Sequence, residues 1–372
     1  MINLLQIQMV QFFWTNLMLL AFICMGLCFI AISVWKNKTF IKRFHLNYEA
    51  IQKLHVDPTP RLGGLVIFLS LIFFCLITNN IEIKTFLTMF LTAMAAVALI
   101  TVAEDLKQTV PFSVRLASQF ITASLLVLWM PSHLPIIDIP LISQLFEVEA
   151  FRVGFFILCL VGLMNGMNFI DGANGLMPMV TIAGLVNLLF LSILSSDSYY
   201  ISLILVNLIP MTTSLFFNYP FGKIFAGDFG AYLYGSILGF LTINFFAVHP
   251  EFSSWTALLI VFYPSLELVY SFFRKIIQGK SPFEPDRSHL HIKVFDLLLK
   301  GGAKHSLANN LIVIFISIFW LAPMFIIPWV YTSTSLILLS LIILTFIYIA
   351  LNIVIPSVFK PQATLEKNNN LV

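Results

Sequence analysis

The stretch Asn165–Leu176 reads NGMNFIDGANGL and lies between two long apolar runs. It contains three Asn, one Asp and three Gly, where a membrane helix would be rich in Leu and Ile. Gly-Ala-Asn-Gly is typical of a turn, so we expect one helix to end here and another to begin. A tight polar turn between two membrane helices is the simplest interpretation. Such a turn does not need Asn168 and Asp171 three residues apart, where they share a helix face, so the spacing favours a functional site.

The composition of the whole chain is that of a membrane protein. Of its 372 residues, 59% are hydrophobic and 10% are charged, and the mean hydropathy is +0.97. A bilayer-spanning helix needs about 20 consecutive apolar residues. We therefore expect an all-α polytopic membrane protein, with one integral-membrane domain over 1–372, motifs in about 55–307 and a polar tail at 360–372. The eleven apolar runs that predict helices are about 13–35, 63–80, 85–103, 112–130, 153–168, 176–195, 199–217, 229–248, 254–273, 308–329 and 333–356.

The basic residues indicate how these helices are oriented. If the N-terminus lies outside, eleven helices place all of the 20 Lys and Arg on the inner side except Lys84 and Arg152. Positive residues accumulate in cytoplasmic loops, so this arrangement predicts that the polar loops are cytoplasmic. The net charge of +3 then reflects a basic cytoplasmic face and does not indicate nucleic-acid binding.

Two polar clusters precede the central stretch on this predicted inner side. Residues 55–64 read HVDPTPRLGG, in which His55 and Arg61 could bind phosphate at the membrane surface. A stiff entry into the next helix is the alternative interpretation. Glu104 and Asp105 close the third helix, where acids oppose the helix dipole and could handle a cation or a proton. A solvated loop, in which neighbouring basic residues pair with the acids, is the alternative there.

Two further clusters follow the central stretch. Asp228 has glycine neighbours at the start of a helix in FNYPFGKIFAGDFG (217–230), where a metal ion or a phosphate could approach the backbone. An ordinary helix N-cap is the alternative for this residue. His289 and His291 lie in the longest inner loop and suit phosphate binding better than zinc, because no Cys accompanies them. A solvated basic loop is the alternative. Glu267 lies in a predicted apolar helix. Its side chain would either face a polar interior or reach the inner surface of the membrane.

All of these clusters fall on one predicted face of the membrane. Carboxylates, Asn amides and basic side chains together are typical of a site for Mg²⁺ and a pyrophosphate, because hard cations take oxygen ligands and Mg²⁺ commonly shares substrate phosphates. The apolar helices beside the site suggest that one substrate is a lipid.

The motifs resemble those of the polyprenyl-phosphate N-acetylhexosamine-1-phosphate transferases, the superfamily of MraY and WecA. The resemblance covers about 55–307, with PTPRLGG, NFIDGANGL, FNYP, KIFAGDFG and PDRSHLH in order. It implies ten or eleven helices in the bacterial inner membrane and an active site on the cytoplasmic face. It also implies transfer of a sugar-1-phosphate from a UDP-sugar to undecaprenyl phosphate with release of UMP. Such a step would begin the synthesis of a surface polysaccharide or a cell-envelope glycan.

The resemblance also implies individual roles for residues. Asp228 would be the ligand of Mg²⁺ or Mn²⁺, Phe225 would stack on the uracil, and His289 and His291 would contact the phosphates or the sugar. The full predicted set is Glu104, Asp105, Asp171 and Asp228 for catalysis, and His55, Arg61, Asn168, Asn174, Asn218, Phe225, His289 and His291 for substrate binding. Three positions depart from the family: Glu104 and Asn174 stand where the family usually has Asp, and Ile292 stands where it has a third His.

Two other functional classes stay open at this stage. A transporter or flippase for a lipid-linked or anionic solute would place its polar groups near the bilayer midplane, whereas only Glu267 is a candidate for an intramembrane carboxylate here. An inactive scaffold is the third class, because three family positions are changed. For the enzyme, the expected partners are a UDP-N-acetyl sugar, undecaprenyl phosphate and membrane lipid, without nucleic acid. A homodimer is also possible, and the identity of the sugar is open.

Overall fold

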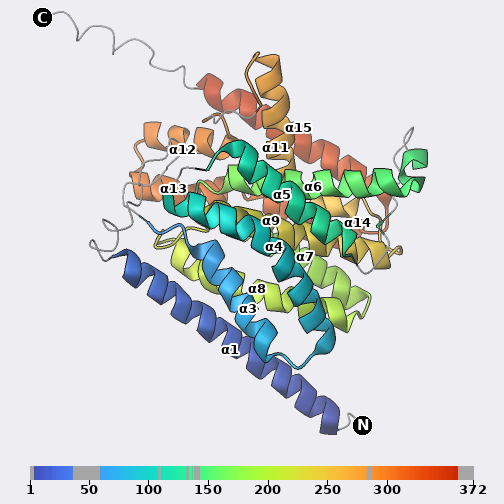
Figure 1. Ribbon diagram of the computed structural model, residues 1–372. Coiled ribbons are helices and arrows are strands. Elements are labelled where there is room, and N and C mark those ends of the chain that lie inside the picture. Colours follow the sequence, from blue (N-terminus) through green and yellow to red (C-terminus); the bar gives the residue numbers. More distant parts are fainter. Residues whose placement is uncertain are drawn as a thin grey trace, which may run out of the picture.

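The computed structural model describes residues 4–36, 59–107, 110–130, 134–135, 137, 143–282 and 287–358. Within these ranges the chain forms helices and connecting loops and no strand (Figure 1). The predicted all-α fold is therefore confirmed. His55 lies outside the described residues, so its predicted role stays a prediction.

Every predicted apolar run coincides with a helix or with two consecutive helices. The run at 254–273 divides into two helices, and so does the run at 308–329. The elements are α1 (Leu4–Trp35), α3 (Gly63–Ile77), α4 (Ile81–Lys107), α5 (Phe112–Leu128), α6 (Glu149–Ile170), α7 (Leu176–Leu194), α8 (Ser198–Asn218), α9 (Gly227–Val248), α10 (Thr256–Ile260), α11 (Phe262–Ile277), α13 (His305–Phe315), α14 (Ile318–Val330) and α15 (Thr334–Val358).

Two short elements lie in segments that we expected to be loops. They are η1 (Ser143–Glu147), before α6, and α12 (Leu290–Lys300), in the last long inner loop. Residues buried on α12 include Leu290, Val294 and Phe295, so one face of this helix packs on the bundle.

The described residues include eight helical segments that are long and apolar enough to cross a membrane. They are Phe13–Trp35 of α1, Ile81–Leu106 of α4, α6, α7, α8, α9, His305–Val330 and Thr334–Ile355. Helices α3 and α5 are apolar but shorter. The protein is thus a polytopic membrane protein, while the number of eleven crossings and the external N-terminus stay predictions.

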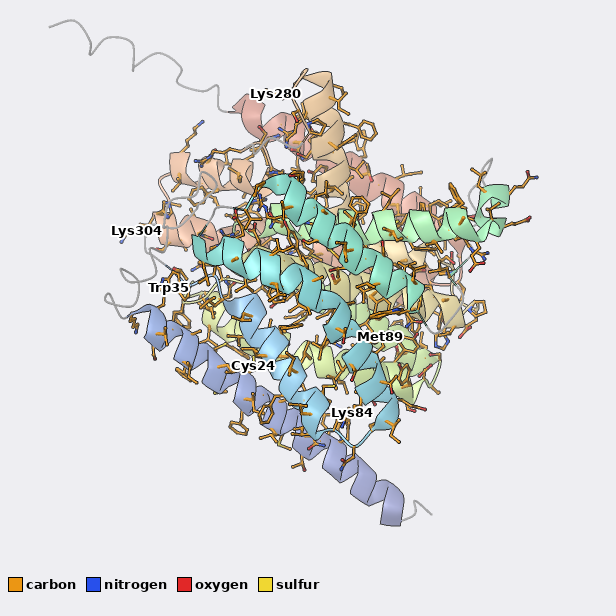
Figure 2. The ribbon with its side chains drawn as sticks, viewed as in Figure 1. Cys24, Trp35, Lys84, Met89, Lys280 and Lys304 are labelled. Atoms are coloured by element: carbon orange, nitrogen blue, oxygen red, sulfur yellow. The ribbon has the colours of Figure 1, made fainter. Side chains whose placement is uncertain are left out.

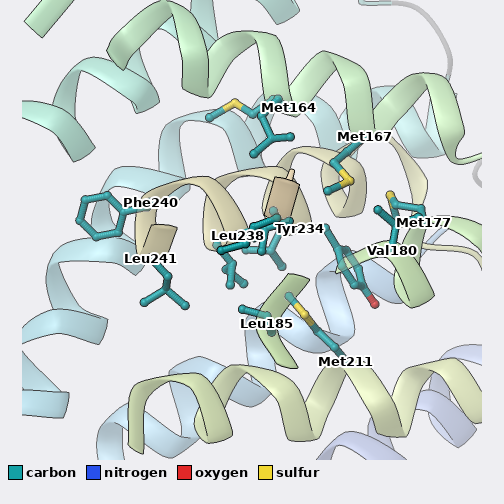
Figure 3. Packing of buried hydrophobic residues seen from close by; sticks show 14 of the residues in the cluster. Met164, Met167, Met177, Val180, Leu185, Met211, Tyr234, Leu238, Phe240 and Leu241 are labelled. Carbon is teal, nitrogen blue, oxygen red and sulfur yellow. The ribbon is translucent and has the colours of Figure 1, made fainter. Parts of the chain in front are cut away.

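Helix α9 is the centre of the bundle. It packs against α3, α4, α6 and α7, and all of its residues up to Phe246 are buried. A helix that is apolar all round is expected to be surrounded in this way. Close packing depends on small residues: an ideal Cβ atom on Gly235 would lie 2.9 Å from the Cα of Met164 on α6. Figure 3 shows buried Met, Leu and aromatic side chains filling the space around this helix.

Charged side chains lie toward both ends of the bundle. Lys304 is found toward the end at which α1 finishes with Trp35, whereas Lys84 lies toward the opposite end (Figure 2). Both lysines are exposed. The predicted location of Lys84 on the outer side of the membrane, opposite most of the basic residues, stays a prediction.

Candidate active site

Two of the sequence motifs meet at the start of α9. The N–H of Phe225 donates to the carbonyl of Pro60 at 2.8 Å, and the N–H of Gly64 donates to the carbonyl of Ala226 at 2.9 Å. An ideal Cβ atom on Gly64 would lie 2.2 Å from the Cα of Gly230. Only glycine allows this approach, which brings the segment before α3 directly against the first turn of α9.

Asp105 on α4 caps the same turn. Its carboxylate accepts the backbone N–H of Asp228 at 2.7 Å and that of Phe229 at 3.0 Å. The first amides of a helix have no partner within the helix, so a carboxylate from a neighbouring helix replaces the usual N-cap. Gly227 has φ +77°, and an ideal Cβ atom there would lie 2.6 Å from an oxygen of Asp105. The glycine before Asp228 is therefore required by backbone conformation and by space.

The carboxylate of Asp228 lies between two guanidinium groups. Arg61 donates to one of its oxygens at 2.8 Å, and Arg115 on α5 donates to the other. Asn168, at the end of α6, also hydrogen-bonds this carboxylate. A buried carboxylate is stable only when it is paired and hydrogen-bonded. Arg115 extends the cluster to Glu104, whose Oε1 atom lies 3.7 Å from Nη1 of Arg115.

Asp171 follows the last residue of α6 and faces the same turn. Its carboxylate hydrogen-bonds the amide of Gly227 and interacts with the charges of Arg61 and Asp228. Burial raises the pKa of Asp171 to about 7, with Arg61 opposing the shift and Asp228 adding to it. A group that titrates near neutral pH can take up or release a proton at little cost, which suits a role in acid–base chemistry.

Asn174 and Asn218 lie beside this cluster and hold its loops. Asn218 accepts the N–H of Gly175 at 2.6 Å and donates to the carbonyl of Ile224 at 2.8 Å. Asn174 donates through its amide to Asn310 on α13 at 2.7 Å. Both side chains connect loops that the sequence separates widely. Their predicted contacts with a substrate stay predictions, and the structure adds this structural role.

Phe225 is the residue expected to stack on the uracil. It lies in the loop between α8 and α9 and is buried, with 8% of its surface exposed. Its position next to the first turn of α9 is compatible with a nucleotide site beside Asp228, and the stacking itself stays a prediction.

The two histidines pack against the turn that follows α6. The Nδ1 atom of His289 lies 2.9 Å from Oε1 of Glu267 on α11. The rings of His289 and His291 are stacked with centroids 5.8 Å apart, and the ring of Phe169 lies 4.9 Å from His289. An ideal Cβ atom on Gly172 would lie 2.9 Å from Nε2 of His291. Burial, with the neighbouring His289, lowers the pKa of His291 to about 3, so His291 is neutral at physiological pH.

Sequence reasoning missed several residues of this region. Arg115 was considered only as a partner of the preceding acids, and its pairing with Asp228 spans 113 positions along the chain. Asn309 and Asn310 were not singled out, although two adjacent amides at the start of an apolar run are a visible signal. The pairing of Glu267 with His289 was also not anticipated, although both residues were noted separately.

The donor atoms suit a hard cation. Among the described residues, no three His, Cys, Asp or Glu side chains form a ready-made metal cluster. Mg²⁺, however, usually combines one or two carboxylates with substrate phosphates and keeps several waters. Asp228, with the oxygen atoms of Asp171 and Asn168 nearby, offers the ligands that such an ion prefers. The residues present therefore fit Mg²⁺ bound together with a substrate.

Known proteins are similar to this chain over most of its length. Residues 86–246, which include Glu104, Asp105, Asp171 and Asp228, match the family described as Glycosyl transferase family 4. The "Probable undecaprenyl-phosphate N-acetylglucosaminyl 1-phosphate transferase" of Bacillus subtilis is 24% identical over 292 residues, which cover 77% of this chain and 79% of that protein. The decaprenyl-phosphate N-acetylglucosaminephosphotransferase of Mycobacterium tuberculosis is 25% identical over 304 residues, which cover 73% of each chain.

A third relative comes from Thermotoga maritima. Its undecaprenyl-phosphate alpha-N-acetylglucosaminyl 1-phosphate transferase is 26% identical over 264 residues, which cover 70% of this chain and 75% of that protein. These alignments extend over most of each chain, and they confirm the resemblance seen in the sequence motifs. The chain is thus similar over most of its length to polyprenyl-phosphate N-acetylglucosamine-1-phosphate transferases, and its residues 86–246 match glycosyl transferase family 4.

Proposed function

We propose that the protein transfers an N-acetylhexosamine 1-phosphate, as one unit, from a UDP-sugar to undecaprenyl phosphate and releases UMP. The observation that carries this proposal is the position of Asp228. It lies at the first turn of α9, between two arginines and close to three other acids. The names of the relatives favour N-acetylglucosamine as the sugar and a polyprenyl phosphate as the acceptor.

The chemistry of the acceptor decides what the site must supply. A phosphate monoester has a second pKa of about 6, so at neutral pH it is mostly a dianion and needs no strong base. The main obstacle is the electrostatic repulsion between the lipid phosphate and the pyrophosphate of the donor. Positive charge beside the phosphates reduces this repulsion. Arg61 and Arg115 carry such charge and already lie on either side of Asp228. Mg²⁺ or Mn²⁺ bound through Asp228 would neutralise the pyrophosphate and stabilise the leaving UMP.

The remaining residues would hold the donor and the acceptor. Phe225, Asn168 and Asp171 lie close to the start of α9, where they would line the nucleotide pocket. His289 and His291 lie beside the turn that follows α6. Backbone amides at a helix N-terminus favour anions. The polyprenyl chain would lie in the bilayer against the apolar helices, with the phosphate at the cytoplasmic surface of the bacterial inner membrane. The product would then begin the assembly of a surface polysaccharide or a cell-envelope glycan.

A reaction with purified protein tests the proposal. The protein would be incubated with undecaprenyl phosphate, Mg²⁺ and a panel of UDP-N-acetyl sugars, and the released nucleotide would be identified. We expect UMP, released only in the presence of the lipid, together with exchange of labelled UMP into the UDP-sugar when the lipid product is supplied. Release of UDP would instead identify an ordinary glycosyltransferase, and uptake into vesicles without a covalent product would support the transporter alternative.

A further inference from the structure

Glu267 is a buried acid that the proposed reaction does not yet use. It lies on α11 with 1% of its surface exposed, and its Oε1 atom is 2.9 Å from Nδ1 of His289. The hydroxyl groups of Tyr263 and Tyr348 lie beside the same carboxylate. Burying a carboxylate is costly unless it is paired, and an apolar residue would often serve packing as well.

The pair of Glu267 and His289 reaches the candidate active site. Helix α11 packs along α6, which carries Asn168 and ends just before Asp171. On the other side of its ring, His289 contacts Phe169 and stacks on His291, which lies over Gly172. The chain of contacts from the acid thus ends at the turn that we assign to the nucleotide pocket. If the Glu267–His289 pair served only to hold α11 and α12 together, its contacts would not need to extend to this turn.

The hydrogen bond at one nitrogen of an imidazole determines what the other nitrogen can do. A carboxylate can only accept a hydrogen bond, so the contact with Glu267 requires a proton on Nδ1 of His289. The Nε2 atom is then available to contact a ligand. His291 differs, because its Nδ1 atom is buried without a partner. The two neighbouring histidines are therefore equipped for different tasks.

We propose that Glu267 is a positioning residue for the transfer reaction, which holds the Nδ1 proton of His289 and so directs Nε2 toward the phosphates or the sugar of the donor. The inference rests on the proposed function, because His289 meets a donor only if the substrate is a UDP-sugar. Glu267 itself touches no substrate. Its effect passes entirely through the ring of His289, and this feature separates the proposal from a purely structural role.

A double-mutant cycle tests this feature. Turnover and KM for both substrates would be measured for the wild type, Glu267→Gln, His289→Gln and the double variant, with thermal midpoints in detergent. We expect Glu267→Gln to lower kcat by roughly ten- to a hundredfold, with both KM values within about threefold of the wild type. The double variant should be no slower than His289→Gln, because residues that act as one unit are not additive. The proposal would be overturned if Glu267→Gln kept the wild-type kcat. It would also be overturned if the fold reduction in kcat of the double variant equalled the product of the two single reductions.

Asp197→Asn is a matched control. Asp197 pairs with His249 at 3.1 Å at the other end of α9, so this variant weakens a second acid–histidine pair far from Asp228. It should leave kcat unchanged.

A spectroscopic measurement separates this inference from the proposed reaction. ¹⁵N NMR of the histidine side chains, with the His289 signal assigned from the His289→Gln spectrum, reports which nitrogen carries the proton without any turnover. We expect a protonated Nδ1 in the wild type, and an unprotonated Nδ1 would refute the positioning role. An inactive wild type with the expected spectrum would refute only the proposed reaction.

Discussion

The carboxylate of Asp105 on α4 accepts the backbone N–H of Asp228 at 2.7 Å, so one predicted acid fixes the position of another. Its second oxygen accepts the N–H of Phe229. The catalytic importance expected for Asp105 from the sequence thus has a second possible origin. The residue aligns the first turn of α9, whatever it does to the phosphate of the lipid.

Asp105→Asn should reduce both stability and turnover. The new amide nitrogen must face one of the two backbone N–H groups, and a buried donor without an acceptor costs roughly 1–3 kcal/mol. Thermal midpoints and initial rates would measure the two effects. Since the defect is one of position, activity should not recover as the pH is raised. Partial recovery at high pH would instead favour the sequence-based hypothesis that Asp105 accepts a proton. Glu104→Asp serves as the comparison and should keep substantial activity.

Asp228→Asn should abolish the response to Mg²⁺ and nearly all turnover, by roughly a hundredfold or more. The change keeps the size of the side chain but removes the charge that pairs with Arg61 and Arg115. Rates over a range of Mg²⁺ and Mn²⁺ concentrations would show the loss. A variant with a normal metal dependence would place the ion elsewhere, and the assignment of this residue would be withdrawn.

The membrane orientation can be measured with single cysteines. In a background without Cys24, Cys28, Cys75 and Cys159, we would introduce Lys84→Cys, Lys280→Cys and Lys304→Cys, which replace exposed residues. In intact cells an impermeant thiol reagent should label position 84 and leave 280 and 304 unlabelled until the membrane is opened. Labelling of 84 and 304 from the same side would contradict the predicted arrangement of the basic residues.

The free energy of unfolding should depend on pH because of His291. Its pKa is about 3 in the folded protein and about 6.5 in an unfolded chain. Between these values the unfolded state binds more protons, so the free energy of unfolding should fall as the pH is lowered from about 6.5 to about 3. Denaturant unfolding in detergent at several pH values would reveal the slope, and His291→Gln should flatten it.

The helices were largely predictable because a membrane-spanning helix needs about 20 consecutive apolar residues. Where this rule was insufficient, local residues determined where a helix begins or ends. The run at 254–273 divides at Val261, and Pro264 explains the break, since it has no N–H to donate to the carbonyl four residues earlier. Helix α12 was missed because its eleven residues are too few and too polar for a membrane run. An apolar face formed by Leu290, Val294 and Phe295 was nevertheless present in the sequence.

The candidate site was predictable in its residue types but not in its pairings. Acids, amides and histidines in inner loops pointed to one polar face, and the structure brings the described members together around the start of α9. The sequence could not show that Arg115 would pair with Asp228. It also could not show that both the oxygen and the nitrogen of the Asn218 amide would hydrogen-bond backbone groups. Such contacts depend on how distant helices pack, and no local pattern encodes them.

The approach of α3 to α9 gives a test that involves no charged group. An ideal Cβ atom on Gly64 would lie 2.2 Å from the Cα of Gly230, a backbone atom that cannot move aside alone. Gly64→Ala should therefore separate the two helices, shift Arg61 away from Asp228, and lower both thermal stability and turnover, the latter by at least about tenfold. Gly154→Ala is the matched control, because a Cβ atom there meets nothing within 4 Å. That helix should become slightly more stable, by roughly 0.5–1 kcal/mol, with unchanged turnover. If Gly64→Ala behaved like Gly154→Ala, the contact between the two motifs would not be what positions the arginine, and Arg61 would have to be aligned by its ion pairs alone.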